Sequence, residues 1–188
     1  GTAFARLNRF KILTAVRKGP YGVESMNQRV EKALRRQGRI PSMIHGASGW
    51  YPGRPVMITR NDYYHGLFNG DVGITLTRPG SPSNEMQVFF PGPQGTFKAL
   101  APHQLPEHET VYAMTIHKSQ GSEFDRVMVV LPDADLPLLT RELIYTAVTR
   151  SRASIDIWAD PSLLALAVQR PIQRASGLRD ALWYGDSR

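Results

Sequence analysis

The spacing of apolar positions changes twice along the chain, and each change predicts a different kind of structure. Residues 10–16 form an apolar run of strand length, and the Gly-Pro pair at 19–20 breaks the pattern. From about Glu24 to Gln37 apolar residues recur every three or four positions, which predicts a helix. Between 42 and 108 glycine and proline become dense, and we expect short strands at 55–59, 73–77, 86–90 and 96–100. Such short strands with turn-rich joints are typical of a small antiparallel barrel.

The pattern after Val111 is that of an α/β domain. We expect strands at 111–116, 127–131 and 154–158, with helices from Thr140 to Arg150 and from Pro161 to Arg170. The continuous apolar run at 127–131 suits a parallel strand with both faces covered. A β-rich module thus interrupts an α/β domain. The predicted boundaries are 1–48 and 109–170 for the α/β domain, 49–108 for the insert and 171–188 for a C-terminal tail.

Composition narrows the class of protein. The chain has no cysteine, which excludes disulfides and thiolate chemistry, and no apolar run long enough to span a membrane. Its start lacks the pattern of a secretory signal, so we expect a cytoplasmic location and no membrane partner. Residues 1–40 hold ten Lys or Arg against two Glu, a charge of +8, and the remainder sums to −1. This basic segment suits either a polyanion such as a nucleic-acid backbone or a solvated helix face.

Two segments concentrate polar chemistry. Residues 115–124, Thr-Ile-His-Lys-Ser-Gln-Gly-Ser-Glu-Phe, follow an apolar strand, at the place where ligands usually bind α/β sheets. An ordinary polar turn is the alternative. Residues 140–152 form a helix that ends near Arg150, and such an arginine can stabilise a transferring phosphoryl group or simply meet solvent.

Taken together, the two segments resemble motifs V and VI of superfamily 1 helicases. Motif V reads roughly Thr-x-His-Lys-x-Gln-Gly-x-Glu-Phe, and motif VI ends in Tyr-x-Ala-x-Thr-Arg; residues 115–124 and 145–150 follow both patterns. Residues 17–27 resemble the motif IV region of the RecD family, which includes the alpha subunit of exodeoxyribonuclease V. Residues 54–73 are similar to its SH3-like 2B insert, and 105–110 to the stretch leading into motif V. The resemblance covers nearly the whole chain.

The resemblance implies a fold and a set of roles. The fold would be a RecA-like second motor lobe, called 2A, of the P-loop-NTPase type, interrupted by the SH3-like 2B barrel. Arg150 would be the arginine finger that reaches the γ-phosphate of ATP. The motifs place four further residues near the nucleotide: Gln120, Gly121, Glu123 and Arg17. Lys18 is the alternative to Arg17 as the basic residue of motif IV. Three residues would lie on the side of single-stranded DNA: Thr115, His117 and Lys118.

The insert adds a candidate DNA surface of its own. Arg60, Tyr63 and Tyr64 combine cationic and aromatic side chains, which suits stacking on bases along a nucleic-acid backbone. Phe68 belongs to the same stretch, but we expect it to fill the core of the barrel instead. The resemblance further implies 5′ to 3′ translocation on single-stranded DNA, and RecB and RecC as partner subunits.

The phosphate-gripping half of an ATP site is missing from these 188 residues. They contain no Gly-Lys dipeptide and therefore no P-loop of the form Gly-x-x-x-x-Gly-Lys-Ser/Thr. Residues 127–133 mimic a magnesium-binding strand with an acidic end, but Pro132 would displace Asp133. We therefore expect a missing N-terminal RecA-like lobe to bind most of the ATP and Mg²⁺, no metal site here, and no ATP hydrolysis by the chain alone.

Two other readings stay open. The chain could be a lobe of a stand-alone RecD-like helicase or of a conjugative relaxase-type helicase. It could also be a non-catalytic module in which a barrel and an α/β platform dock DNA or protein. A P-loop upstream in the same reading frame would separate a motor from a binding module.

Overall fold

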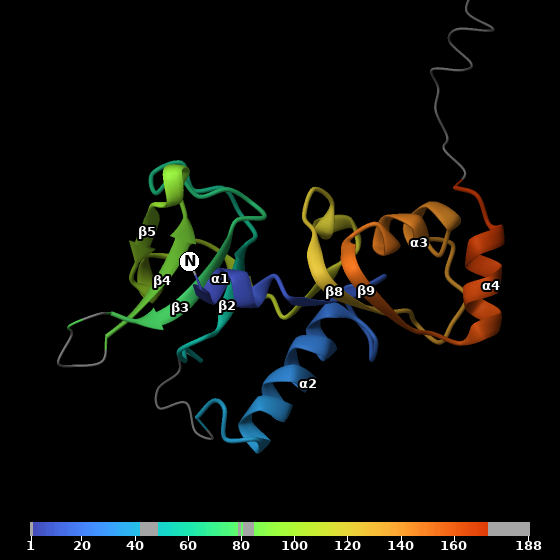
Figure 1. Cartoon of the computed structure of the whole chain (residues 1–188), viewed down its shortest axis with the longest axis horizontal. Coiled ribbons are helices and arrows are strands. Elements are labelled where there is room, and N and C mark those ends of the chain that lie inside the picture. The colour runs from blue at the N-terminus through green and yellow to red at the C-terminus, as the bar shows by residue number, and fades with distance from the viewer. Residues whose placement is uncertain (1, 42–48, 79, 81–84, 173–188) are drawn as a thin grey trace, which may run out of the picture.

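The chain forms two β-sheets that lie side by side, with helices gathered around one of them (Figure 1). The computed structural model describes residues 2–41, 49–78, 80 and 85–172. The predicted tail beyond residue 172, and parts of the 1–48 segment and of the turn at 79–82, lie outside the described residues.

The first sheet is parallel and has the order β7-β1-β8-β9. Its central strand β1 comes from before the second sheet in the sequence, whereas its neighbours β7 and β8 come from after it. The α/β domain is therefore discontinuous, as its apolar pattern predicted, although the exact domain boundaries stay predictions. The strand bounds are β1 Phe10–Thr14, β7 Ala113–Thr115, β8 Phe124–Val130 and β9 Ser151–Trp158.

The second sheet is antiparallel and has the order β5-β4-β3-β2-β6. All four strands expected in the insert are present, and a fifth, β6, leads from this sheet back toward β7. The bounds are β2 Pro55–Ile58, β3 Val72–Thr77, β4 Met86–Pro91, β5 Phe97–Leu100 and β6 His108–Thr110. An antiparallel insert is thus confirmed, and its SH3-like character stays a prediction.

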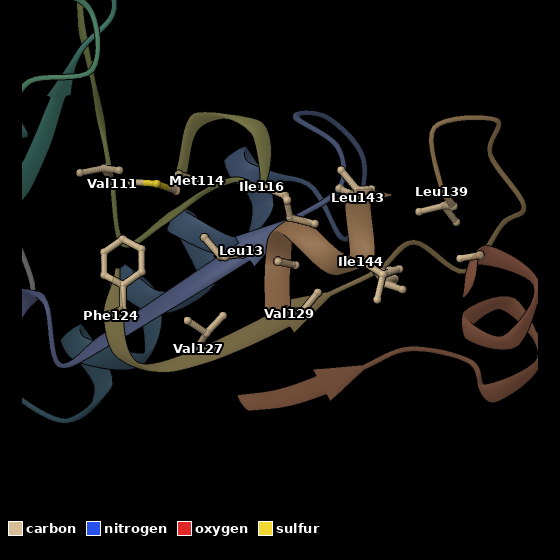
Figure 2. Close-up of a cluster of buried hydrophobic side chains, with 14 of the residues drawn as sticks. Leu13, Val111, Met114, Ile116, Phe124, Val127, Val129, Leu139, Leu143 and Ile144 are labelled. Carbon is tan, nitrogen blue, oxygen red and sulfur yellow. The ribbon is translucent and has the colours of Figure 1, made fainter. Parts of the chain in front are cut away.

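Helices cover both faces of the parallel sheet. Helix α2 (Val23–Arg36) packs through Met26 against Ile12 and Ala113. Helices α3 (Arg141–Val148) and α4 (Pro161–Gln169) pack on the opposite face, where Leu143 and Ile144 meet the odd-numbered side chains of β1 and β8 (Figure 2). This two-sided cover explains why residues 127–130 of β8 are all apolar.

The hydrophobic core continues from one sheet into the other. Met57 of β2 belongs to the same buried cluster as Val111, Met114 and Phe124. A hydrogen-bonded group reinforces this junction: the buried Tyr51 hydroxyl donates to Glu31 of α2 at 2.7 Å and lies 3.2 Å from the hydroxyl of Tyr112. The insert is therefore fixed against the lobe rather than merely tethered to it.

Three details differ from the sequence-based expectations. Helix α1 (Thr2–Leu7) was not anticipated; it stacks Phe4 on Phe97 of β5 with ring centroids 5.6 Å apart. The strand expected at 111–116 is split, because β6 pairs with β2 in the second sheet and β7 pairs with β1 in the first. The expectation that Phe68 fills the core was wrong: Phe68 is 50% exposed, and the adjacent Leu67 is buried in its place.

Lys11 is a buried cation inside the parallel sheet. Its side chain is 2% exposed, its Nζ donates to the carbonyl oxygen of Val111 at 2.9 Å, and it lies over the ring of Phe124. Burial lowers the pKa of Lys11 to about 8, because the charged ammonium loses its hydration.

We predict that this burial makes the stability of the chain depend on pH in an identifiable window. Lys11 loses its proton near pH 8 when folded but only near its ordinary pKa of 10.5 when unfolded. Between these values the unfolded state binds more protons, so the free energy of unfolding rises with pH, by roughly 3 kcal/mol across the window. Urea unfolding at several pH values should show this rise in the wild type and not in Lys11→Met; parallel curves for the two proteins would contradict it.

Candidate functional site

The first part of the site is the crossover from β7 to β8. Because β1 lies between these two parallel strands, residues 116–123 must carry the chain from the carboxyl end of β7 back to the amino end of β8. Ile116 and Ser119 are fully buried, and the Ser119 hydroxyl donates to the carbonyl oxygen of Ile116 at 2.7 Å. The backbone N–H of Lys118 donates to the hydroxyl of Thr115 at 3.2 Å. These anchors fix the turn and leave residues 120–123 exposed.

Gly121 gives this crossover its shape. Its φ of +83° lies in the left-handed region, and a Cβ added there would meet nothing within 4 Å. The glycine is therefore required by backbone conformation and not by crowding.

The second part of the site is Arg150, just past the end of α3. Its guanidinium donates to the carbonyl oxygens of Ser122 and Thr146 and to the hydroxyl of Thr149, each at 3.1 Å. The backbone is joined as well, because the Phe124 N–H donates to the Arg150 carbonyl at 2.9 Å. The 120–123 turn and Arg150 are therefore in direct contact in the structure.

The hydrogen bonds leave Arg150 partly free. A guanidinium has five N–H donors, and three are used in these bonds. Within the described part of the chain Arg150 makes no ion pair, and its side chain is half-buried at the sheet edge. Beside it Arg152 pairs with Glu123 at 2.9 Å. The guanidinium is thus held by hydrogen bonds, but no carboxylate of the described residues neutralises its charge. Such a group is suited to binding an anion supplied from outside the chain.

A separate cluster forms at the carboxyl ends of β1 and β7. Arg17 binds both carboxylate oxygens of Glu109, at 2.8 and 3.3 Å, and Lys118 Nζ lies 3.9 Å from one of them. The hydrogen bond and the charge of Glu109 raise the pKa of Arg17. Arg17, which the resemblance put near the nucleotide, is thus joined to Lys118 through Glu109, and among described contacts nothing joins it to the 120–123 turn.

The insert presents an aromatic hairpin close to this cluster. Asp62 and Leu67 exchange backbone hydrogen bonds, and the Asp62 carboxylate accepts from the backbone N–H groups of Tyr64 and His65. This tight turn holds Tyr63 and Tyr64 outward, 79% and 92% exposed.

Two contacts tie the hairpin region to its surroundings. The ring of Tyr63 packs edge-on against Phe68, with centroids 6.1 Å apart. Lys118 Nζ donates to the side-chain oxygen of Asn69 at 3.4 Å, which links the crossover to the hairpin. Arg60 is exposed and pairs with Glu107 at 2.9 Å, and His117 is exposed as well.

Sequence reasoning missed two residues that organise these groups. Glu109 stood out only as part of the 105–110 stretch, because its partner Arg17 lies 92 residues away along the chain. Lys11 looked like an ordinary polar position in a strand, and only the packing of Phe124 and Val111 shows that it is buried.

Two classes of feature are not found in the described part of the chain. Residues 2–41, 49–78, 80 and 85–172 contain no group of three or more His, Cys, Asp or Glu arranged to hold a metal ion. Nor is any helix in these ranges long and apolar enough to cross a membrane.

Comparisons with known proteins place these features in a context. Residues 110–155 match the model of the UvrD-like helicase C-terminal domain. The chain is 42% identical to the RecBCD enzyme subunit RecD of Mycolicibacterium smegmatis, over 96% of this chain and 30% of that protein. It is 37% identical to the ATP-dependent RecD2 DNA helicase of Deinococcus radiodurans, over 76% of this chain and 19% of that protein. The chain therefore spans less than a third of the length of either relative.

A solved structure supports the fold. The Pif1 helicase from Bacteroides, crystallised with ADP-AlF3 and single-stranded DNA, superposes with a TM-score of 0.55 at 18% identity, covering 96% of this chain and 46% of that one. At this identity the likeness concerns the fold alone. Together with the parallel sheet and its flanking helices, it supports an α/β RecA-like lobe as the fold that contains the first sheet.

We predict that Gly121→Ala lowers the free energy of unfolding by about 1 kcal/mol, because an alanine pays the cost of the left-handed conformation. Gly121→Asn should cost less, since asparagine tolerates that region better. Chemical denaturation of the three proteins measures the order Gly, Asn, Ala. Equal stabilities for Asn and Ala would show that the turn adopts another conformation.

Proposed function

Since this chain is homologous to the C-terminal region of RecD subunits, we propose that it forms the second motor lobe of an ATP-dependent DNA helicase, with the antiparallel sheet as an SH3-like 2B insert. The relatives and the fold support a helicase motor lobe in general terms. The roles of individual residues, the substrate and the partners are proposals.

One observation carries the assignment: the guanidinium of Arg150 donates to the carbonyl oxygen of Ser122. This contact joins the crossover of motif V to the arginine of motif VI, two segments 28 residues apart. In this proposal the two form one wall of an ATP site, and a P-loop lobe supplies the other. Arg150 then uses its remaining donors on the γ-phosphate as negative charge shifts during transfer.

The neighbours of Arg150 are proposed to hold the nucleotide rather than to react with it. Gln120, Gly121 and Glu123 are exposed beside the guanidinium, and the Glu123–Arg152 pair fixes one carboxylate there. Glu123 already faces Arg152, and the described residues contain no group of three or more His, Cys, Asp or Glu side chains that could hold a metal ion. We therefore propose that the P-loop lobe holds the metal ion.

We propose that single-stranded DNA runs along the side that carries Lys118 and the aromatic hairpin. Thr115, His117 and Lys118 lie in or beside the crossover, and Arg60, Tyr63 and Tyr64 lie on the insert. Contacts between Lys118 and Asn69 bring the two groups together. Exposed tyrosines can stack on bases of any sequence, as a stepping motor requires. Arg17 shares Glu109 with Lys118, so we move Arg17 from the nucleotide to this side.

Among helicases of this kind, we favour a RecBCD-type subunit over a stand-alone enzyme. The RecD match extends over 96% of the chain at 42% identity, against 76% at 37% for the RecD2 helicase. On this proposal the partners are RecB, RecC and an N-terminal RecA-like lobe, translocation is 5′ to 3′, and the role is unwinding for recombination and double-strand-break repair in the cytoplasm. A stand-alone or relaxase-type helicase lobe, or a non-catalytic binding module, is the alternative.

We predict that Arg150→Ala abolishes ATP hydrolysis while leaving nucleotide binding nearly unchanged, because the contact to the γ-phosphate is made in the transition state. The experiment replaces the matching part of the Mycolicibacterium smegmatis RecD with this chain and measures ATP turnover and ATP affinity in its complex. The turnover should fall by about 10³- to 10⁵-fold.

The matched control for this experiment is Arg126→Ala, an exposed arginine paired with Asp156 on the far strands of the sheet. Its turnover should equal that of the unmodified chimera. A collapse of ATP affinity in Arg150→Ala would make Arg150 a ground-state clamp, and ATP turnover by the 188-residue chain alone, surviving the substitution, would refute the division of the ATP site.

We predict that Tyr63→Ala and Tyr64→Ala each weaken binding of single-stranded DNA by roughly 5- to 100-fold, because stacking contributes about 1–3 kcal/mol per base. Fluorescence anisotropy with labelled oligonucleotides measures the affinity at fixed salt. Trp158→Ala is the control, because Trp158 is likewise an exposed aromatic residue (68%) but lies on β9, outside the hairpin. Equal effects of all three substitutions, or none, would remove the hairpin from the DNA path.

A further inference from the structure

Glu109 lies in a groove beside strand β6. The groove has a volume of about 770 Å³, and Arg17, Glu109 and Lys118 are among the residues that line it. The backbone of Glu109 is paired with Met57 in the β2–β6 ladder, so the carboxylate projects from a fixed strand. Its side chain is 19% exposed, against 48% for Arg17 and 31% for Lys118. The carboxylate is therefore the most buried member of the cluster, and the two cations are more accessible to solvent.

The contacts of this carboxylate match those that a backbone phosphate would make. Arg17 grips both of its oxygens in a forked arrangement, which is also the way arginine binds a phosphate. A phosphodiester carries one negative charge, as a carboxylate does, and offers two oxygens of similar spacing. Glu109 thus occupies the donors that a DNA strand in this groove would use.

The strength of these contacts allows exchange. The side chains of Arg17 and Lys118 are 48% and 31% exposed, so water and salt screen their attraction to the carboxylate. The Lys118 contact, at 3.9 Å, is longer than a hydrogen bond. An incoming phosphate can therefore take over either cation without a large cost in stability, while the fixed carboxylate stays behind and repels it.

We propose that Glu109 is a built-in competitor of the nucleic-acid backbone, which holds Arg17 and Lys118 in the DNA-free chain and weakens the grip of the groove on each phosphate. This inference rests on the proposed binding of single-stranded DNA and adds to it a residue that sets its strength. Such a carboxylate lets a motor release one phosphate before it takes the next. Arg17 and Lys118 bind the strand, and Glu109 is a positioning residue that acts through them.

The test compares Glu109→Gln with the wild-type chain in titrations with a labelled oligothymidine at several salt concentrations. Freed from Glu109, the two cations should bind the strand about tenfold more tightly at low salt. The slope of log K against log[salt] should become steeper by about 0.7 for each additional phosphate neutralised. Asp156→Asn, which removes the same charge from an exposed ion pair on β9, should change neither quantity appreciably.

A double substitution separates competition from a structural role. In a chain that already carries Arg17→Ala and Lys118→Ala, adding Glu109→Gln should leave the affinity unchanged, because the cations through which it acts are gone. A gain that persists in this background, or weaker binding by Glu109→Gln alone, overturns the proposal. Thermal unfolding followed by circular dichroism verifies that every variant is folded.

These titrations distinguish failure of the proposed role of Glu109 from failure of the proposed DNA binding. If the wild type binds the oligonucleotide and Glu109→Gln behaves like Asp156→Asn, only the role of Glu109 is refuted. If neither the wild type nor Glu109→Gln binds, the DNA-binding proposal and the competitor fall together, and the Arg150 experiment in the chimeric complex still decides whether the chain is a motor lobe.

Discussion

The position of β1 between β7 and β8 is the constraint on which the site depends. Two parallel strands that flank a third cannot be joined by a short turn, so residues 116–123 have to traverse the sheet from one end to the other. The segment thereby touches both of the groups described above. Its beginning contributes Lys118 to the cluster around Glu109, and its end contributes the Ser122 carbonyl to Arg150. One short segment of chain thus lies between the proposed DNA side and the proposed ATP side.

This arrangement suggests a physical route for coupling between the proposed ATP side and the proposed DNA side. A shift of the exposed residues 120–123 that follows nucleotide binding at Arg150 would reach Lys118, and its contacts with Asn69 and Glu109, only through the buried Ser119. The insert would not absorb such a shift by swinging away. Met57 shares the core of the lobe, and Tyr51 ties the start of the insert to Glu31 of α2.

Much of the fold could be predicted from the apolar periodicity. The long helix α2, the four insert strands and the continuous strand β8 were foreseen because local spacing determines them. The split between β6 and β7 could not be foreseen, since it depends on which sheet each half joins, and strand pairing is not local. Phe68 was misjudged for a related reason: Leu67 and Phe68 are both apolar, and only the Asp62–Leu67 bridge decides which of the two points inward.

Site residues that belong to a sequence motif could be predicted. Site residues whose role depends on a contact between distant parts of the chain could not. The two motifs indicated the crossover and Arg150 as candidate segments, and the hydrogen bond from Arg150 to Ser122 joins them. The partner of Arg17 lies 92 residues away along the chain, and no short-range pattern points to Glu109. The burial of Lys11 likewise depends on the ring of Phe124, which comes from another strand.

The outer strand β9 carries a consequence for handling the protein. It is the last strand of the described sheet, and a bare strand edge can recruit a strand from another molecule and begin aggregation. Charged side chains at Arg152 and Asp156 and a register irregularity opposite Phe124–Arg126 make such recruitment unfavourable. Replacing these charges to improve crystal packing would therefore remove a safeguard against intermolecular sheet formation.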